Sequence, residues 1–126
     1  MKYTLSVIKS FASAHCLREY KGKCENMHGH NWKVRAAFCG TELDKTGMLM
    51  DFTDIKAHLD NIMLYLDHKF LNEIPPFNGI NPTAENIASY IFNELKKTET
   101  DTAKVCEVEV WESETSSATV TAIGCL

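Results

Sequence analysis

The sequence contains no apolar run long enough to cross a membrane. No stretch approaches about 18 consecutive apolar residues, and the basic residue near the start is not followed by the apolar region of a secretory signal. There is no bias toward Pro, Ser or Gln that would indicate disorder, and no repeat at a period of roughly 20 to 50 residues. We therefore expect a cytoplasmic protein that folds as a single domain over residues 1–126.

Basic residues are also scarce. The chain has 13 basic and 17 acidic side chains, and this net charge of −4 gives no footprint for nucleic acid or for an anionic membrane. One segment is different, because between positions 18 and 35 five basic residues stand against two acidic ones. The five are Arg18, Lys21, Lys23, Lys33 and Arg35. They form either a patch that attracts a small polyanionic substrate or a solvated loop.

The cysteines lack the regular spacing of a secreted disulfide scaffold. There are five, an odd number, and they are scattered along the chain. They are Cys16, Cys24, Cys39, Cys106 and Cys125. We expect reduced thiols, one of which takes part in chemistry.

The apolar pattern predicts two strands, then two helices, then two strands. Alternation over residues 3–15 predicts a first strand, with a bulge near Ile8 and Lys9, and alternation from Trp32 predicts a second strand that ends at Gly40. Two further strands are expected over residues 105–112 and 118–123. The order ββααββ indicates an α+β domain in which helices cover one face of a four-stranded antiparallel sheet.

Helical spacing replaces alternation in the middle of the chain. A first helix begins at Phe52, with Asp51 or Asp54 as its cap, and Thr83 caps a second helix after the turn-rich segment 74–82. The expected buried positions of the first helix are Phe52, Ile55, Leu59, Ile62, Met63 and Leu66, and those of the second are Ile87, Ile91 and Leu95. The open edges of such a sheet favour oligomerisation.

Three histidines are expected at one end of this sheet. His28 and His30 share the face of Trp32, and His15 ends the first strand on its apolar face. A hairpin between the two strands would bring the three imidazoles together. Three histidines with a fourth position open are typical of a catalytic zinc site. The alternative is a set of core histidines that hydrogen-bond to the backbone.

Two thiols lie near these histidines in the sequence. Cys24 precedes His28 by four residues, outside the register of the strand, and Cys16 follows His15 directly. Either thiol could be a fourth ligand that closes a structural zinc site. Alternatively, it acts as an acid, base or nucleophile beside an open metal site.

Two acidic positions are further candidates. Asp67 and His68 follow the first helix, either as part of a proton relay or as a solvated helix terminus. Glu112 shares a strand face with Cys106, Val108 and Val110, which brings a carboxylate onto an apolar face. This carboxylate either meets the donors of a planar, amidine-like ligand edge or is an exposed acid at the strand end. We interpret His58 as a surface residue.

Taken together, these residues resemble the 6-pyruvoyl-tetrahydropterin synthase and 6-carboxy-tetrahydropterin synthase family. Six ordered motifs carry the resemblance: Phe11-Ala12-Ser13-Ala14-His15, Cys24 with His28-Gly29-His30, Gly47-Met48-Leu49-Met50-Asp51-Phe52, Leu66-Asp67-His68, Asn81-Pro82-Thr83-Ala84-Glu85-Asn86, and Trp111-Glu112. The resemblance implies the tunnelling fold, in which ββααββ subunits form a barrel, usually as a homohexamer of two stacked trimers with sites between subunits.

The resemblance also implies a role for each candidate residue. The zinc ligands fall on His15, His28 and His30, and the catalytic cysteine falls on Cys24. The Asp-His pair falls on Asp67 and His68. Glu112 corresponds to the glutamate that anchors the pterin, and Thr83 and Glu85 lie in the motif that supports pterin recognition. The spacing from Cys24 to His28 is similar to that of the 6-carboxy branch of the family.

The implied reaction belongs to queuosine precursor synthesis. It converts 7,8-dihydroneopterin triphosphate to 6-carboxy-5,6,7,8-tetrahydropterin, with release of acetaldehyde and triphosphate and with Zn²⁺ as cofactor. The basic segment would then steer the triphosphate. Two alternatives stay open: a sister pterin enzyme that makes the 6-pyruvoyl product, and a non-catalytic, zinc-stabilised interaction module.

Overall fold

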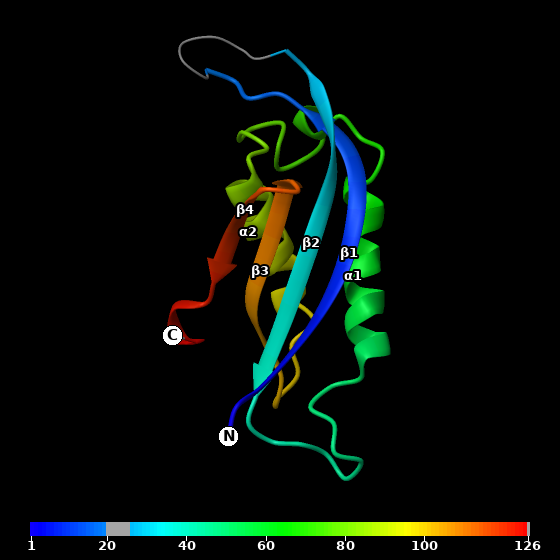
Figure 1. Cartoon of the computed structure of the whole chain (residues 1–126), viewed down its shortest axis with the longest axis vertical. Helices are drawn as coiled ribbons and strands as arrows, with labels where there is room; N and C mark the ends of the chain where they lie inside the picture. The colour runs from blue at the N-terminus through cyan, green and yellow to red at the C-terminus, as the bar shows by residue number, and fades with distance from the viewer. Residues whose placement is uncertain (20–25, 126) are drawn as a thin grey trace.

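Four antiparallel strands form one sheet in the order in which they occur along the chain (Figure 1). The structure, a computed structural model, describes residues 1–19 and 26–125. The strands are β1 (Tyr3–His15), β2 (His28–Gly40), β3 (Lys104–Ser113) and β4 (Ser116–Thr121). The predicted antiparallel sheet and its ββααββ order are confirmed, although the last strand begins and ends two residues earlier than expected and is followed by the 3-10 turn η2 (Ile123–Cys125).

Two helices, α1 (Phe52–Leu66) and α2 (Ala84–Lys96), pack against the sheet. Each begins at a side chain that accepts a hydrogen bond from its first turn: Asp51 accepts from the Thr53 N–H, and Thr83 accepts from the Asn86 N–H. The 3-10 turn η1 (Leu71–Glu73) lies in the connection between them. Among the described residues, no helix combines the length and apolarity needed to cross a membrane.

The core lies between the helices and one face of the sheet. The expected apolar positions of α2 are buried, and so are those of α1 except Phe52, which is 51% exposed at the first position of the helix. Lys9 points toward the same side as the core residues of β1, and its ammonium lies 3.2 Å from Asp60 of α1. This ion pair accommodates a charge on the covered face without a break in the strand.

The pairing of β1 with β2 is uninterrupted from Tyr3 opposite Gly40 to His15 opposite His28. The predicted bulge near Ile8 and Lys9 was therefore wrong. Because Lys9 reaches Asp60 at the helix surface, the strand keeps its alternation through that position.

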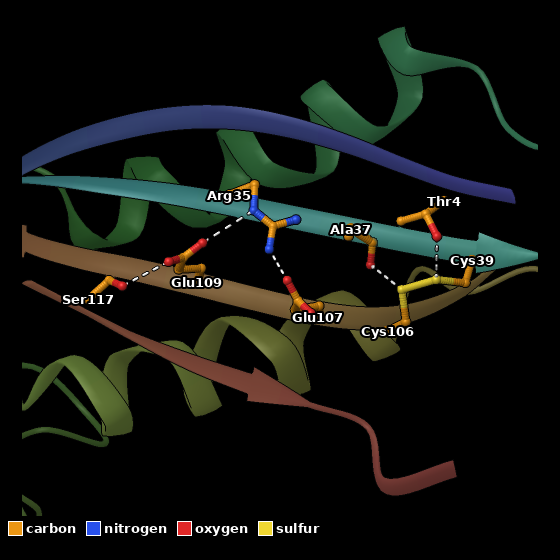
Figure 2. Close-up of polar contacts among 8 residues, drawn as sticks. All are labelled: Thr4, Arg35, Ala37, Cys39, Cys106, Glu107, Glu109 and Ser117. Atoms are coloured by element: carbon orange, nitrogen blue, oxygen red, sulfur yellow. Dashed lines mark hydrogen bonds and ion pairs between the residues drawn. A yellow bond between two sulfur atoms is a disulfide. The ribbon is translucent and has the colours of Figure 1, made fainter. Parts of the chain in front are cut away.

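A bulge occurs in β3 instead. Phe38 pairs with Val105 and Ala37 pairs with Glu107, so Cys106 is the extra residue between them. The extra residue turns Cys106 away from the core and against Cys39, with which it forms a disulfide (Figure 2). Two expectations were therefore wrong: that Cys106 shares a face with Val108 and Val110, and that these thiols are reduced.

The face of the sheet opposite the helices also carries an ion-pair network. The Arg35 guanidinium contacts the carboxylates of Glu107 and Glu109, and the Ser117 hydroxyl donates to Glu109 at 2.8 Å (Figure 2). Arg35 is thus paired with acids of the neighbouring strand.

Candidate metal centre

Three histidines meet where β1 ends and β2 begins. His15 is paired with His28 in the sheet, and His30 is paired with Ser13, so all three side chains lie on the covered face. One ligand atom from each histidine and one from Glu112 all lie within 4.8 Å of one another. The structure thus brings together the three histidines that the strand pattern predicted to meet, and adds a carboxylate.

Backbone carbonyls set the orientation of two of the rings. The Nδ1 atom of His15 lies 2.7 Å from the Pro82 carbonyl oxygen, and that of His28 lies 3.0 Å from the Asn26 carbonyl oxygen. Because a carbonyl only accepts, each Nδ1 carries a proton and donates it, which leaves the Nε2 of each neutral ring with an unprotonated lone pair. The two Nε2 atoms are 3.1 Å apart.

This donor set fits a metal ion. Lone pairs that face each other at this distance repel unless a cation or a proton lies between them. Two nitrogens at about 2.0–2.1 Å from a tetrahedral zinc are separated by about 3.3–3.4 Å, close to the observed spacing. His15 is 1% exposed, and the buried Trp32 indole lies against both His15 and His30, which holds the rings in place.

Glu112 completes the cluster. Its Oε1 lies 3.3 Å from His30 Nε2, and its side chain is 38% exposed. The pairing of β3 with β4 is irregular at this point, with Trp111 opposite Ser117 and Ser113 opposite Ser116. The sequence pattern left Glu112 as either a ligand-binding or an exposed carboxylate, and the family resemblance implied a pterin anchor; neither indicated that its carboxylate lies beside a histidine. At this position Glu112 can serve as a fourth ligand or turn toward a substrate.

A cleft of about 290 Å³ adjoins Glu112. Glu85, in the first turn of α2, lines the cleft together with Glu112 and the serines of the β3–β4 turn. Thr83 is not among the residues that line the cleft. Its hydroxyl accepts the Asn86 N–H as the cap of α2. Of the two residues expected to support a ligand, Glu85 is therefore the one beside the cleft, and Thr83 fixes the helix that carries Glu85.

Asp67 and His68 form a pair at the outer edge of β1. Their side chains are 2.7 Å apart, and Asp67 also accepts the Ala12 N–H at 2.8 Å. The Ala12 N–H, followed by His68, holds the pKa of the Asp67 carboxyl below its ordinary value. The His68 side chain is 82% exposed, and neither residue belongs to the histidine cluster of its own chain.

The two thiol candidates have different outcomes. Cys24 lies outside the described residues. Cys16 is described, and its sulfur is not part of the metal-ligand group found among the described residues. The backbone N–H and carbonyl of Cys16 both bond to the Asn72 side chain.

The described basic residues of segment 18–35 each contact other groups of the fold. The Arg18 guanidinium donates to three backbone carbonyls, Lys33 lies 4.1 Å from the centroid of the Trp111 ring, and Arg35 is paired with acids. Lys21 and Lys23 lie outside the described residues. The described members are therefore engaged within the fold, and the two interpretations of the segment, an anion-attracting patch or a solvated loop, stay predictions.

Comparison with known proteins identifies the family. The chain belongs to the 6-pyruvoyl tetrahydropterin synthase family, whose model matches residues 4–122. The solved structure of 6-pyruvoyl tetrahydropterin synthase from Caenorhabditis elegans has a TM-score of 0.85 and 28% identity, and the match covers 97% of this chain and 96% of that chain. The predicted tunnelling fold is therefore confirmed.

Named relatives fall in both branches of the family. The 6-carboxy-5,6,7,8-tetrahydropterin synthase of Synechocystis is 40% identical over 114 residues, which is 86% of this chain and 85% of the relative. The 6-pyruvoyl tetrahydrobiopterin synthase of Poecilia reticulata is 38% identical over 104 residues, 71% of each chain. The protein is thus an enzyme, a lyase with pterin synthase activity.

Proposed function

We propose that this protein is a zinc-dependent 6-carboxy-5,6,7,8-tetrahydropterin synthase. It converts 7,8-dihydroneopterin triphosphate and one water molecule to 6-carboxy-5,6,7,8-tetrahydropterin, acetaldehyde and triphosphate. The observation that carries the proposal is the convergence of three imidazoles, two of which turn unprotonated nitrogens toward each other, in a chain that is 40% identical to a relative of that name. In this proposal residues 1–126 form a single tetrahydropterin synthase domain.

The metal would be held by His15, His28 and His30. A zinc ion bound there supplies a Lewis acid that stabilises negative charge on substrate oxygens. Two of these ligands are preset for it, because the carbonyls of Pro82 and Asn26 hold their Nδ1 protons, so that each would coordinate through Nε2. Glu112 stays outside the metal's ligand set and accepts hydrogen bonds from the amino group and ring N–H of the pterin.

The remaining residues supply binding and proton transfer. Cys24, as a thiolate, removes the carbon-bound proton of the substrate, and the Asp67–His68 pair moves protons. Glu85 supports the pterin from the cleft that Glu112 lines, and Thr83 supports it by fixing the start of α2.

The active form in this proposal is an oligomer, with a homohexamer as the family expectation. β1 and β4 are the two edge strands of the described sheet, and an edge strand such as β4 can pair with a strand of another chain. The exposed His68 supports the same proposal, because an Asp-His pair that faces away from its own histidine cluster can serve the cluster of a neighbouring chain.

One experiment tests this function. The purified protein is incubated with 7,8-dihydroneopterin triphosphate, and the pterin product is identified by mass, before and after treatment with a chelator. We expect 6-carboxy-5,6,7,8-tetrahydropterin, with its formation lost on chelation and restored by Zn²⁺. A 6-pyruvoyl product would favour the other branch, to which the Poecilia relative belongs. Binding of zinc without any turnover would favour the non-catalytic module.

A further inference from the structure

Two asparagine side chains extend the pairing of β1 beyond its last residue. The Asn72 amide accepts from the Cys16 N–H at 2.9 Å and donates to the Cys16 carbonyl at 2.8 Å. The Asn81 amide makes the same two bonds with Arg18, at 2.8 and 2.9 Å. A side-chain amide that pairs with both the N–H and the carbonyl of one residue makes the hydrogen bonds that a neighbouring strand would otherwise make. The chain after His15 is therefore held against residues 72–81.

The Arg18 side chain binds backbone carbonyls along the connection between α1 and α2. Its guanidinium donates to the carbonyl oxygens of Asn72 at 3.0 Å, Phe77 at 2.7 Å and Ile80 at 3.2 Å. Hydrogen bonds from an ionised donor are the stronger kind, and these three span most of the connection. Together, Arg18 and Asn81 join the segment after β1 to the residues that immediately precede Pro82.

Pro82 is the residue through which this arrangement reaches the metal centre. Its carbonyl oxygen accepts the Nδ1 proton of His15 at 2.7 Å. The start of α2 fixes the same turn from the other side, because the Asn86 amide donates to the Asn81 carbonyl at 2.8 Å. The hydrogen bond at one ring nitrogen of a histidine sets the tautomer and orientation with which the other nitrogen binds a metal.

We propose that Arg18 and Asn81 are positioning residues for the metal centre: they hold the Pro82 carbonyl where it orients His15, so that His15 Nε2 faces His28 Nε2. The inference rests on the proposed metal site, and it assigns Arg18 a role other than contact with a substrate anion. Neither residue belongs to the group of candidate metal ligands, and both act through Pro82 and His15.

The test is a titration of the full chain with Co²⁺ alone, followed through the visible absorption bands of the bound ion. Asn81→Ala removes both bonds to Arg18, and we expect the Co²⁺ dissociation constant to rise about 10- to 100-fold, as is typical when the partner that orients a metal ligand is lost. Tyr65→Phe is the matched control. It removes a hydrogen bond to the Pro75 carbonyl, which lies in the same connection but is not among the carbonyls that Arg18 binds, and should leave the constant unchanged.

A second variant separates positioning from folding. Asn81→Asp keeps the acceptor for the Arg18 N–H and lacks the donor to the Arg18 carbonyl, so we expect an intermediate loss of affinity. Thermal unfolding of each metal-free protein shows whether it folds. If Asn81→Ala does not fold, the Co²⁺ dissociation constant of Asn81→Asp is compared with that of the unaltered chain instead. Unchanged Co²⁺ affinity in the folded variants overturns the inference. If the unaltered chain shows no bands that depend on His15, the proposed metal site itself is wrong.

Discussion

His15 and His28 direct their Nε2 atoms toward each other across 3.1 Å, while their Nδ1 atoms donate to backbone carbonyls. The relationship follows from the sheet, because these residues form the last pair of the β1–β2 ladder. It also has a chemical consequence, because two imidazoles held in this way match two of the four ligand positions of a tetrahedral metal site.

Cys24 should be essential for turnover and dispensable for metal binding. In the sequence it precedes His28 by four residues, ahead of the predicted strand, and this is the basis for treating it as a base rather than a ligand. Cys24→Ala should abolish product formation while the zinc content and pterin binding stay unchanged. Elemental analysis and a binding titration measure these quantities, with Cys16→Ala as the control thiol variant. Loss of zinc from Cys24→Ala would instead place the thiol among the ligands.

Mixing two inactive variants should restore activity if the site is shared between subunits. Cys24→Ala and Glu112→Ala are each expected to be inactive. A mixed oligomer contains some boundaries at which one chain supplies an intact Cys24 and its neighbour an intact Glu112. The measurement is the product formed after the variants are unfolded together and refolded. Failure of complementation in an intact oligomer would place both residues in the site of one chain.

Asp67 should contribute to stability in a pH-dependent way. Its pKa lies below the ordinary value of 3.8 because Ala12 and His68 donate to the carboxylate. The ionised form is therefore favoured by folding, so its contribution is complete above about pH 4 and is lost as the pH falls through the lowered pKa. In urea unfolding, Asp67→Asn should be less stable than the unaltered protein at about pH 7, and the difference should shrink toward about pH 3.

Asp44 offers a matched comparison for that experiment. Hydrogen bonds, first from the Thr46 side chain, also hold the pKa of its carboxyl below the ordinary value. For Asp44→Asn, the difference in unfolding free energy from the unaltered protein should likewise shrink as the pH falls, and turnover should stay intact. Asp67→Asn should also slow turnover. A stability difference for Asp67→Asn that is constant with pH would contradict the assignment of its lowered pKa.

The disulfide between Cys39 and Cys106 should stabilise the fold. The two residues are 67 positions apart, and closing a loop of that length is worth about 4 kcal/mol of unfolding free energy. Treatment with dithiothreitol, or the double change of Cys39 and Cys106 to Ala, should lower the stability by that amount, measured in urea. Cys16→Ala is the control, since this thiol is free. Alkylation of both cysteines without reductant would show that the bond is absent.

The sequence predicted the strands, the helices and the meeting of the histidines because each depends on a local period. Alternation placed His15, His28 and His30 on the apolar face, and that face is the covered one. Thr83 was predicted as a helix cap from its residue type and position, and it is one.

The features that the sequence did not reveal depend on irregular pairing or on backbone atoms. The bulge at Cys106 reverses the face of one residue, and nothing in the local pattern marks it, so the bond to Cys39 was missed. The Pro82 carbonyl that orients His15 is a backbone group, which any residue carries. Arg18 looked like part of a charged patch because the carbonyls it binds are far away in the chain.

The zinc content of the purified chain and of three histidine variants tests the account most directly. We expect about one zinc per chain in the unaltered protein, since the three histidines form one site. His15→Ala, His28→Ala and His30→Ala should each lose most of the metal and the activity yet remain folded, while Glu112→Gln should keep the metal. Full zinc occupancy in the three histidine variants would contradict the account, as would cooperative unfolding of the unaltered chain on chelation.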